Sequence, residues 1–382
     1  MVIITLKKKV IDEVIMLYGK AIDGFIFLGD YVGDYPWGNK VVELMMELKK
    51  QYSFVAISGN RETGIVHKFY DKVHNYFDNN GHISLPLAEK LTGWSLETSM
   101  GACLYDCCQM TKEQIKFLDS LPSEAILESI NEFVLLKHKT PISKEEIEKF
   151  NKSSKSKYLI VGHTHEPHDK DYEGIRMVNP GAIGLSDTGL KGAYYGIIER
   201  RKIILCKINY DYNLAINELR NNSLLYDKCE HWGQLLEQSI MTGINVTSLY
   251  GSEKKRLIEM YKRLSDNEKH KIINLDTNQA LELSRLLFPA LSIEEKPFSQ
   301  NRYGNTDPYG NYIKVDFYNV TGDNRVTIDS KETISDDVNK SNKGISIDNE
   351  VPLQLINVIA YEHVLEYLKY ANYYNISTGR VY

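Results

Sequence analysis

The sequence predicts an α/β domain followed by a mainly helical C-terminal region. Three observations support this: short apolar runs of strand length, longer stretches with helical spacing between them, and a change of pattern after about residue 210. Where strands and helices alternate along a chain, the helices pack on the faces of a largely parallel sheet. We therefore expect a sheet flanked by helices in the first part of the chain.

The strands and helices of this first part can be assigned in chain order. Helices are expected at residues 10–21, 39–52 and 111–122. Strands are expected at residues 24–30, 54–60, 132–138 and 157–163. The helix at 111–122 begins at Thr111, which can cap it, and residues 192–212 predict a hairpin with Arg200 and Arg201 near its turn.

The rest of the chain has mainly helical patterns. Residues 213–243 are helical in spacing, and we expect a helical extension at 246–298. Residues 299–350 are rich in Asn, Asp, Ser and Gly, which predicts a polar loop or a small β segment. Within it the strand-like runs are residues 312–320 and 325–329. A C-terminal helix is expected at 351–382.

Composition excludes several classes of protein. The chain has 382 residues, 42% hydrophobic and 25% charged, which is ordinary for a globular protein. A net charge of −5 gives no reason to expect nucleic acid or an anionic membrane as a partner. The five cysteines form no C-x-x-C pair, and no apolar stretch resembles a signal peptide or a membrane span. A cytoplasmic location is expected.

Four of the apolar runs end in residue types that bind metal ions. They are followed in turn by Asp30, Asn60, His138 and the pair His163 and His165. Ligands of α/β proteins bind at the carboxyl ends of strands, so these side chains are expected to meet there. Carboxylate, amide oxygen and imidazole together suit Mn²⁺, Fe or Zn²⁺ better than Ca²⁺.

The order Gly-Asp, Gly-Asn, His, Gly-His-x-His resembles the calcineurin-like metallophosphoesterases. Further family features are LGDYVGDYP, SGNRE, TKEQIKFLDSLP and VNPGAIG, and the resemblance covers roughly residues 5 to 245. It implies a β-sandwich of mixed sheets flanked by helices, with residues 1–245 as the metallophosphoesterase-like domain. It also implies divalent metal ions, Mn²⁺ first with Fe or Zn²⁺ as alternatives, and a phosphate ester as substrate.

The resemblance assigns a role to each of the five residues. Asp30 would bridge two metal ions, while Asn60, His138 and His163 would bind one of them. His165 would bind the other ion.

Two departures from the family pattern stand out. The family begins with a strand ending in Asp-x-His, and MVIIT at the start of this sequence offers no such ligand. We therefore expect the domain to be incomplete at its N-terminus and the metal site that His165 serves to be weak. Arg61 stands where many members have a histidine that protonates the leaving oxygen. Arginine is not a general acid near neutral pH, but it can bind phosphate.

Each residue also has a structural interpretation when it is taken alone. His138 could simply hydrogen-bond, Asp30 could cap a helix near Pro36, and Asn60 could form an Asx turn. Glu62 could be a carboxylate in the first turn of a helix or a partner for Arg61. His168 and Asp169 are expected in a solvated turn. Only a shared site explains why the ligand types recur at four strand ends.

The sequence supports two hypotheses about function. The first is hydrolysis of a phosphate mono- or diester by a metal-activated hydroxide, with Asn60, Arg61 and His163 as catalytic residues. The second is a catalytically inactive relative that acts in binding or assembly, which the missing Asp-x-His favours.

Overall fold

The computed structural model divides into two compact units, Met1–Asn245 and Val246–Tyr382. It describes residues 11–12, 14–16, 18–98, 100–129, 132–139, 158–172, 175–199, 202–229, 231–273, 279, 292–295, 313–316 and 353–377. The sequence features at 1–10, 299–312 and 325–329, together with Arg200 and Arg201, lie outside these residues. None of the described helices is both long enough and apolar enough to cross a membrane.

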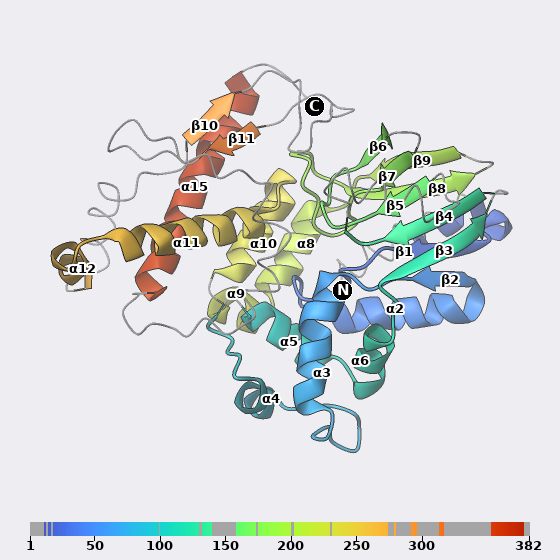
Figure 1. Ribbon diagram of the computed structural model, residues 1–382, viewed down its shortest axis with the longest axis horizontal. Helices are drawn as coiled ribbons and strands as arrows, with labels where there is room; N and C mark the ends of the chain where they lie inside the picture. The colour runs from blue at the N-terminus through green and yellow to red at the C-terminus, as the bar shows by residue number, and fades with distance from the viewer. Residues whose placement is uncertain are drawn as a thin grey trace. The chain divides into compact units, whose positions relative to one another are not determined.

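The first unit alternates strands and helices, as Figure 1 shows. Its described strands are β1 (Gly24–Phe27), β2 (Ser53–Ala56), β3 (Glu124–Ser129), β4 (Glu132–Lys137), β5 (Tyr158–Val161), β6 (His168–Tyr172), β7 (Ile175–Asn179), β8 (Ala193–Glu199) and β9 (Lys202–Ile208). Its described helices are α2 (Gly38–Gln51), α3 (His67–Val73), α4 (Leu85–Thr92), α5 (Gly101–Gln109), α6 (Lys112–Asp119), α8 (Tyr212–Arg220), α9 (Ser223–Lys228) and α10 (Trp232–Thr242). The short turns are a 3₁₀ helix at Gly19–Ala21 and a π-helical turn at Glu62–Val66.

The strands form one mixed sheet and two pairs. The five-stranded sheet has the order β3-β4-β5-β7-β6, with β4, β5 and β7 parallel and the two edge strands antiparallel to their neighbours. β1 pairs with β2 in parallel, and β8 with β9 as the expected hairpin. The four strands with predicted metal ligands are thus divided into two parallel pairs, β1–β2 and β4–β5.

One apolar core joins the five-stranded sheet to the two strand pairs. It contains Val134, Leu136, Ile160, Val178, Ile57 and Ile203, with Ile26, Val55, Ile198 and Leu205 packed against it. Successive strand residues point to opposite faces, so the neighbours of Ile26 and Val55 turn outward to a second core. The prediction of an α/β fold with a mixed sheet flanked by helices is confirmed.

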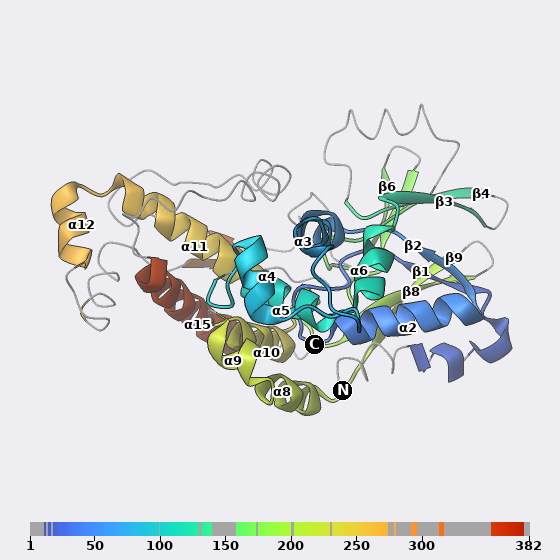
Figure 2. The same cartoon turned by 90° about the horizontal axis from the view of Figure 1, so that it is seen from below.

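Helices cover the outer face of β1 and β2. Phe27, Phe54 and Ala56 belong to this second core, which the helices α2, α3, α5 and α6 complete. Both ribbon views show α2 alongside β1 and β2 (Figures 1 and 2). The helices α8, α9 and α10 follow the hairpin and share a third core with β8, β9 and α5. The sequence predicts α2 and α6 but does not single out α4 or α5.

The second unit is described mainly through its helices. α11 (Val246–Arg263) contacts α15 (Leu353–Ser377), and α12 (Asp266–Ile273) follows α11 in the chain. The strands β10 (Ser292–Glu295) and β11 (Ile313–Asp316) pair antiparallel. The predicted helical C-terminal region is confirmed for these residues.

A buried charged cluster links α11 to α15. Glu253 accepts hydrogen bonds from Arg256 at 2.7 and 2.6 Å, and its carboxylate lies 2.7 Å from Nδ1 of His363. Because all three side chains are buried, the charges of Glu253 and Arg256 need each other as partners, and the imidazole of His363 adds a third contact.

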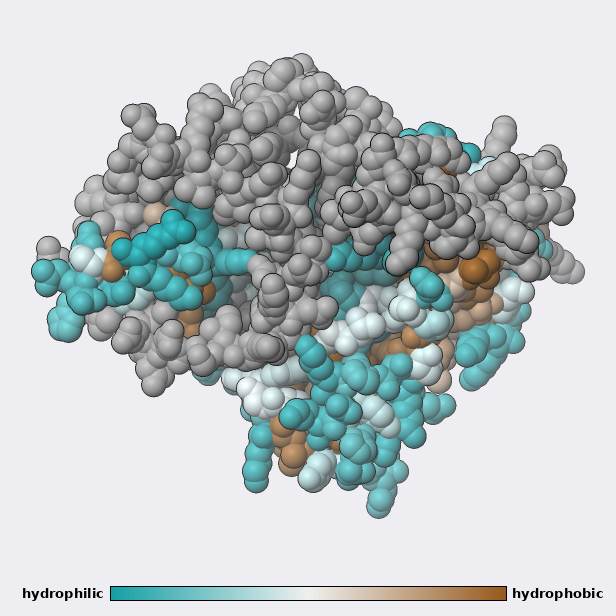
Figure 3. All heavy atoms as spheres, viewed as in Figure 1, coloured by the Kyte–Doolittle hydropathy of each residue, from teal (hydrophilic) through white to brown (hydrophobic). Residues whose placement is uncertain are grey.

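The described surface is mainly hydrophilic in the view of Figure 3, with apolar atoms in smaller groups. Large hydrophobic side chains that are exposed lie on separate elements, among them Ile126 on β3, Ile204 on β9 and Leu214 on α8.

The helix α6 should depend measurably on its capping residue. Thr111 accepts a hydrogen bond from the backbone N–H of Gln114, and the Gln114 side chain accepts one from the N–H of Thr111. Thr111→Ala should lower the free energy of unfolding by about 1 kcal/mol. Chemical denaturation measures this change, and Lys116→Ala, an exposed substitution on the same helix, should change stability by less than about 0.5 kcal/mol.

Candidate metal centre

A buried carboxylate ties together the loops that follow β1 and β2. Glu62 is 1% exposed, and it accepts backbone hydrogen bonds from Asp30 and Gly59 at 2.8 Å and from Tyr31 at 2.9 Å. Three N–H donors satisfy a carboxylate that burial would otherwise destabilise. Glu62 does lie in the first turn of a helix, but the predicted pairing with Arg61 does not describe its hydrogen bonds.

The same two loops approach each other backbone to backbone. A Cβ atom on Gly29 would lie 2.6 Å from the Cα of Gly59, and one on Gly59 would lie 2.3 Å from Oδ1 of Asp30. Gly29 also has a φ of 93°. The glycines before the predicted ligands are therefore required by contact between the loops as well as by the turn.

A second buried carboxylate fixes the loop after Asp30. Asp106 on α5 is fully buried and accepts hydrogen bonds from the N–H of Gly33 at 2.8 Å and of Gly38 at 2.7 Å. The Tyr31 hydroxyl donates to the carbonyl of Ile57 at 2.6 Å, and this bond links the loop to the end of β2.

An asparagine fixes the loop after β5. Nδ2 of Asn179 donates to the carbonyl of Gly162 at 2.7 Å and to the hydroxyl of Thr164 at 3.0 Å. Its Oδ1 accepts from the N–H of Gly181 at 2.8 Å. Asn179 is fully buried, so these bonds hold the Gly-His-x-His segment on both sides of His163.

Four predicted residues meet at the ends of these strands. Nε2 of His138 lies 3.2 Å from Oδ2 of Asp30 and 3.0 Å from Oδ1 of Asn60. Nδ1 of His163 lies 3.0 Å from the same Asn60 oxygen. Asp30, His138 and His163 each offer a ligand atom within 4.8 Å of the other two.

The donor set fits a cation. Nδ1 of His138 lies 2.6 Å from the carbonyl of Leu28, so that nitrogen carries a proton and, in the neutral ring, Nε2 presents a lone pair. This lone pair faces the oxygens of Asp30 and Asn60, which are acceptors too. Acceptors held face to face require a proton or a metal ion between them.

His165 stands apart from this cluster. Its carbonyl accepts a hydrogen bond from the N–H of Asp187 at 3.3 Å, whereas its Nδ1 is buried without a hydrogen-bond partner among the described residues. A buried imidazole nitrogen with no partner is an unused ligand or acceptor position.

Three predicted ligands have a backbone conformation that favours glycine. φ is 57° at Asp30, 70° at His163 and 60° at His165, and His231 is the other described non-glycine residue with positive φ. Each such residue costs on the order of 1 kcal/mol, and strain of this kind gathers at functional sites.

Electrostatics couple the three titratable groups. Burial would raise the pKa of Asp30, but the hydrogen bond and charge of His138, together with Arg61, lower it below its ordinary value. Burial would lower the pKa of His138, but the hydrogen bond and charge of Asp30 raise it. Burial, with the charge of His138, lowers the pKa of His163 to about 4, so the His163 imidazole is neutral at neutral pH.

Arg61 lies beside the cluster and binds elsewhere with its side chain. Its N–H donates to Oδ1 of Asp30 at 2.9 Å, while its guanidinium pairs with Asp34 at 2.7 Å. Nη1 is also 3.7 Å from Sγ of Cys103.

The sequence does not reveal most of the residues that position these ligands. No pattern in the sequence singles out Asp106, Asp34 or the role of Glu62. Asn179 belongs to the family motif VNPGAIG, which is the signal that could have identified it. The expectation for His168 and Asp169 is wrong: His168 is buried at the start of β6, and Asp169 on the same strand pairs with Arg176. Strand pairing with β7 turns His168 inward.

A family model describes the same region. The model of the calcineurin-like phosphoesterase superfamily domain matches residues 7–202. The comparison with curated proteins found no match.

Several solved structures are similar in fold. The hypothetical protein PH1004 from Pyrococcus horikoshii OT3 is 16% identical with a TM-score of 0.47, over 63% of this chain and 93% of its own. A metallophosphoesterase from Sphaerobacter thermophilus is 18% identical with a TM-score of 0.40, over 58% of this chain and 92% of its own. The phosphoesterase Yfce from E. coli is 16% identical with a TM-score of 0.29, over 54% of this chain and 93% of its own. At these TM-scores the neighbours do not bear on function.

Removing the charge of Glu62 should weaken both the fold and the centre. Glu62→Gln replaces one acceptor oxygen by an NH₂ group that faces backbone donors, so the free energy of unfolding should fall by about 2–4 kcal/mol. Zn²⁺ affinity measured by calorimetry should fall at least about tenfold. The exposed substitution Glu97→Gln should change neither, and equal effects of the two variants would contradict this role.

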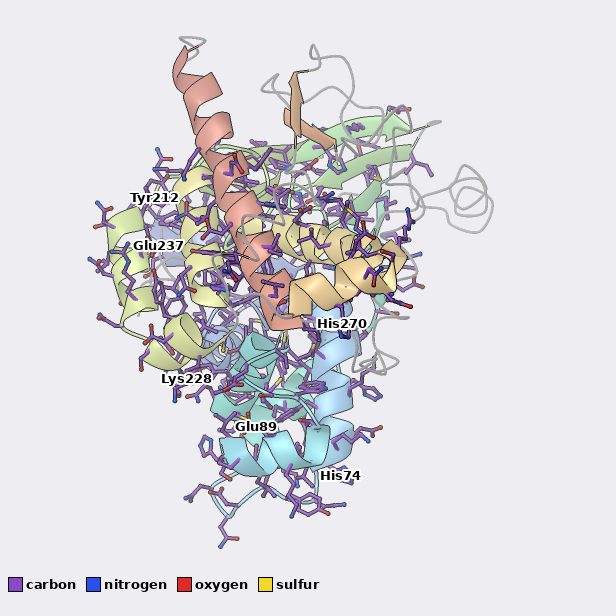
Figure 4. All side chains as sticks on the ribbon, turned by 90° about the vertical axis from the view of Figure 1, so that its left-hand side faces the viewer. His74, Glu89, Tyr212, Lys228, Glu237 and His270 are labelled. Carbon is purple, nitrogen blue, oxygen red and sulfur yellow. The ribbon has the colours of Figure 1, made fainter. Side chains whose placement is uncertain are left out.

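His168 should make stability depend on pH. Burial and Lys170 lower its pKa in the folded protein to about 4, whereas the unfolded chain takes up this proton near pH 6.5. The stability that the neutral, buried imidazole of His168 allows is therefore fully present above about pH 6.5, and it is lost as pH falls toward 4. Urea unfolding measures how far the free energy of unfolding falls between about pH 7 and pH 4.5. In His168→Gln this fall should be smaller by about 2–3 kcal/mol than in wild type. His74→Gln, at an exposed site beyond α3 (labelled in Figure 4), should not reduce it.

Proposed function

Because the chain belongs to the calcineurin-like phosphoesterase superfamily, we propose that it hydrolyses a phosphate mono- or diester with the help of a divalent metal ion. The family supports metal-dependent phosphoester hydrolysis in general, and the group Asp30, His138 and His163 supports divalent metal binding. The observation that carries the proposal is the meeting of four acceptor side chains at four strand ends.

We assign Asp30, Asn60, His138 and His163 as the residues that hold one ion. Their distances of 3.0–3.2 Å and their mutually facing acceptor atoms support this set. His165 is assigned to a second ion, and its buried, unpartnered Nδ1 supports that role. Within the part of the chain that the structure describes, we assign only Asp30 and His165 to this second ion, and on these two ligands it should bind more weakly.

The bound ion would supply a Lewis acid for the phosphoryl oxygens and lower the pKa of a water molecule that attacks phosphorus. The protein's own groups orient the reaction. The Leu28 carbonyl fixes the tautomer of His138, and Asn60 presents its amide between the two imidazoles. His163 stays neutral because of its low pKa, and Arg61 stabilises negative charge on the phosphoryl group.

The finer assignments follow from the donor chemistry. A mixture of carboxylate, amide and imidazole favours Mn²⁺, with Fe or Zn²⁺ as alternatives. The substrate is a phosphate ester, and a cytoplasmic setting fits the free thiols of the described cysteines.

The second hypothesis is an inactive relative that acts in binding or assembly. Metal content and turnover together distinguish the two hypotheses.

Metal binding and hydrolysis should be lost together when a ligand is removed. The protein should retain Mn²⁺ in elemental analysis and hydrolyse bis(p-nitrophenyl) phosphate or p-nitrophenyl phosphate. His163→Ala should reduce kcat/KM by at least about 100-fold, because even residues that only orient ligands cost 10- to 100-fold. His74→Ala removes an exposed imidazole and should retain full activity.

Two results would count against the enzyme. Trace metal with no turnover of either ester would favour the binding or assembly protein. Full activity of His163→Ala would exclude this cluster as the site of the reaction.

A further inference from the structure

The guanidinium of Arg61 is held in a fixed place by residues outside the metal centre. Its Nη2 donates to Oδ1 of Asp34 at 2.7 Å, in a pair whose side chains are only 25% and 15% exposed. The side chain passes Gly33, where a Cβ would lie 3.6 Å from its Cδ, and reaches Sγ of Cys103 at 3.7 Å. A partly buried ion pair with these contacts restricts the arginine more than a surface pair would.

Asp34 is itself held by the surrounding fold. The indole N–H of Trp232 donates to the backbone carbonyl of Asp34 at 3.0 Å. Asp106 accepts hydrogen bonds from the backbone N–H groups of Gly33 and Gly38, which lie before and after Asp34 in the chain. These contacts fix the backbone of Asp34, and its carboxylate pairs with the proposed phosphate-binding arginine.

The ion pair with Asp34 lowers the net positive charge that Arg61 presents to a substrate. Arg61 donates hydrogen bonds, but Asp34 cancels most of its net charge. Arginine stays protonated in proteins, so the 2.7 Å pair with Asp34 is ionic. A phosphate monoester is mostly dianionic at neutral pH, whereas a diester carries a single charge.

We propose that Asp34 is a positioning residue that holds Arg61 and neutralises it, and so makes the site selective for monoanionic phosphodiesters over dianionic monoesters. This inference rests on the proposed phosphoesterase function. Coulomb energy scales with the product of the charges, so removing one negative charge changes the logarithm of affinity about twice as much for a dianion as for a monoanion.

The first test compares two esters with the same leaving group. Wild-type protein should hydrolyse bis(p-nitrophenyl) phosphate with a higher kcat/KM than p-nitrophenyl phosphate. In Asp34→Asn the ratio of diester to monoester kcat/KM should fall by about twofold to threefold, mainly through a lower KM for the monoester. Asp34→Glu keeps the charge and should restore a ratio closer to that of wild type.

A matched control breaks another Asp–Arg pair with the same change of charge. Asp169 on β6 accepts two hydrogen bonds of 2.8 and 2.5 Å from Arg176 on β7, in a pair more exposed than that of Asp34 and Arg61. Asp169→Asn should leave the ratio unchanged.

The second test does not need turnover. Calorimetry at about pH 8 should show inorganic phosphate binding to Asp34→Asn about five- to tenfold more tightly than to wild type, with dimethyl phosphate gaining only about twofold to threefold. Equal gains for the two anions, or none, would overturn the proposal, as would a wild-type preference for the monoester. If wild type hydrolyses neither ester, the phosphoesterase function fails, and the calorimetry still decides whether Asp34 sets the charge preference.

Discussion

The structure of the centre depends on the three hydrogen bonds that Glu62 accepts from the loops after β1 and β2. These loops carry Asp30 and Asn60, and their glycines bring the two backbones into contact. A buried carboxylate with three backbone donors is stable only where those donors converge. The hydrogen bonds of Glu62 therefore set the positions of Asp30 and Asn60 relative to each other, and no bound ion is needed for this.

The second half of the centre is built in the same way on the other sheet. Asn179 at the end of β7 fixes the carbonyl of Gly162, and the carbonyl of Leu28 fixes the ring of His138. The core between the sheets keeps β1–β2 and β4–β5 together, so ligands separated by more than 100 residues meet. Positive φ angles at Asp30, His163 and His165 are retained because these contacts hold the loops.

The sequence predicts which side chains meet at the strand ends better than it predicts the residues that support them. Asp30, Asn60, His138 and His163 share a local signal, a ligand type directly after an apolar run, and the structure brings these four together. Glu62 and Asp106 act on backbone N–H groups up to 73 residues away, and no local pattern encodes such a pairing. His168 was misjudged because HDKDY is polar, yet its register opposite Asn179 turns the imidazole inward.

The same geometry explains why folding and cation binding are linked. Ligand-type atoms of Asp30, Asn60, His138 and His163 lie 3.0–3.2 Å apart, and pairs of acceptor atoms with no proton between them repel one another. The loop hydrogen bonds of Glu62 and Asn179 hold the side chains there against this repulsion. A cation that enters removes the repulsion and binds only the folded arrangement, so it stabilises the fold by mass action. By the same linkage, any change that loosens the loops lowers the affinity for the cation, even when every ligand residue is still present.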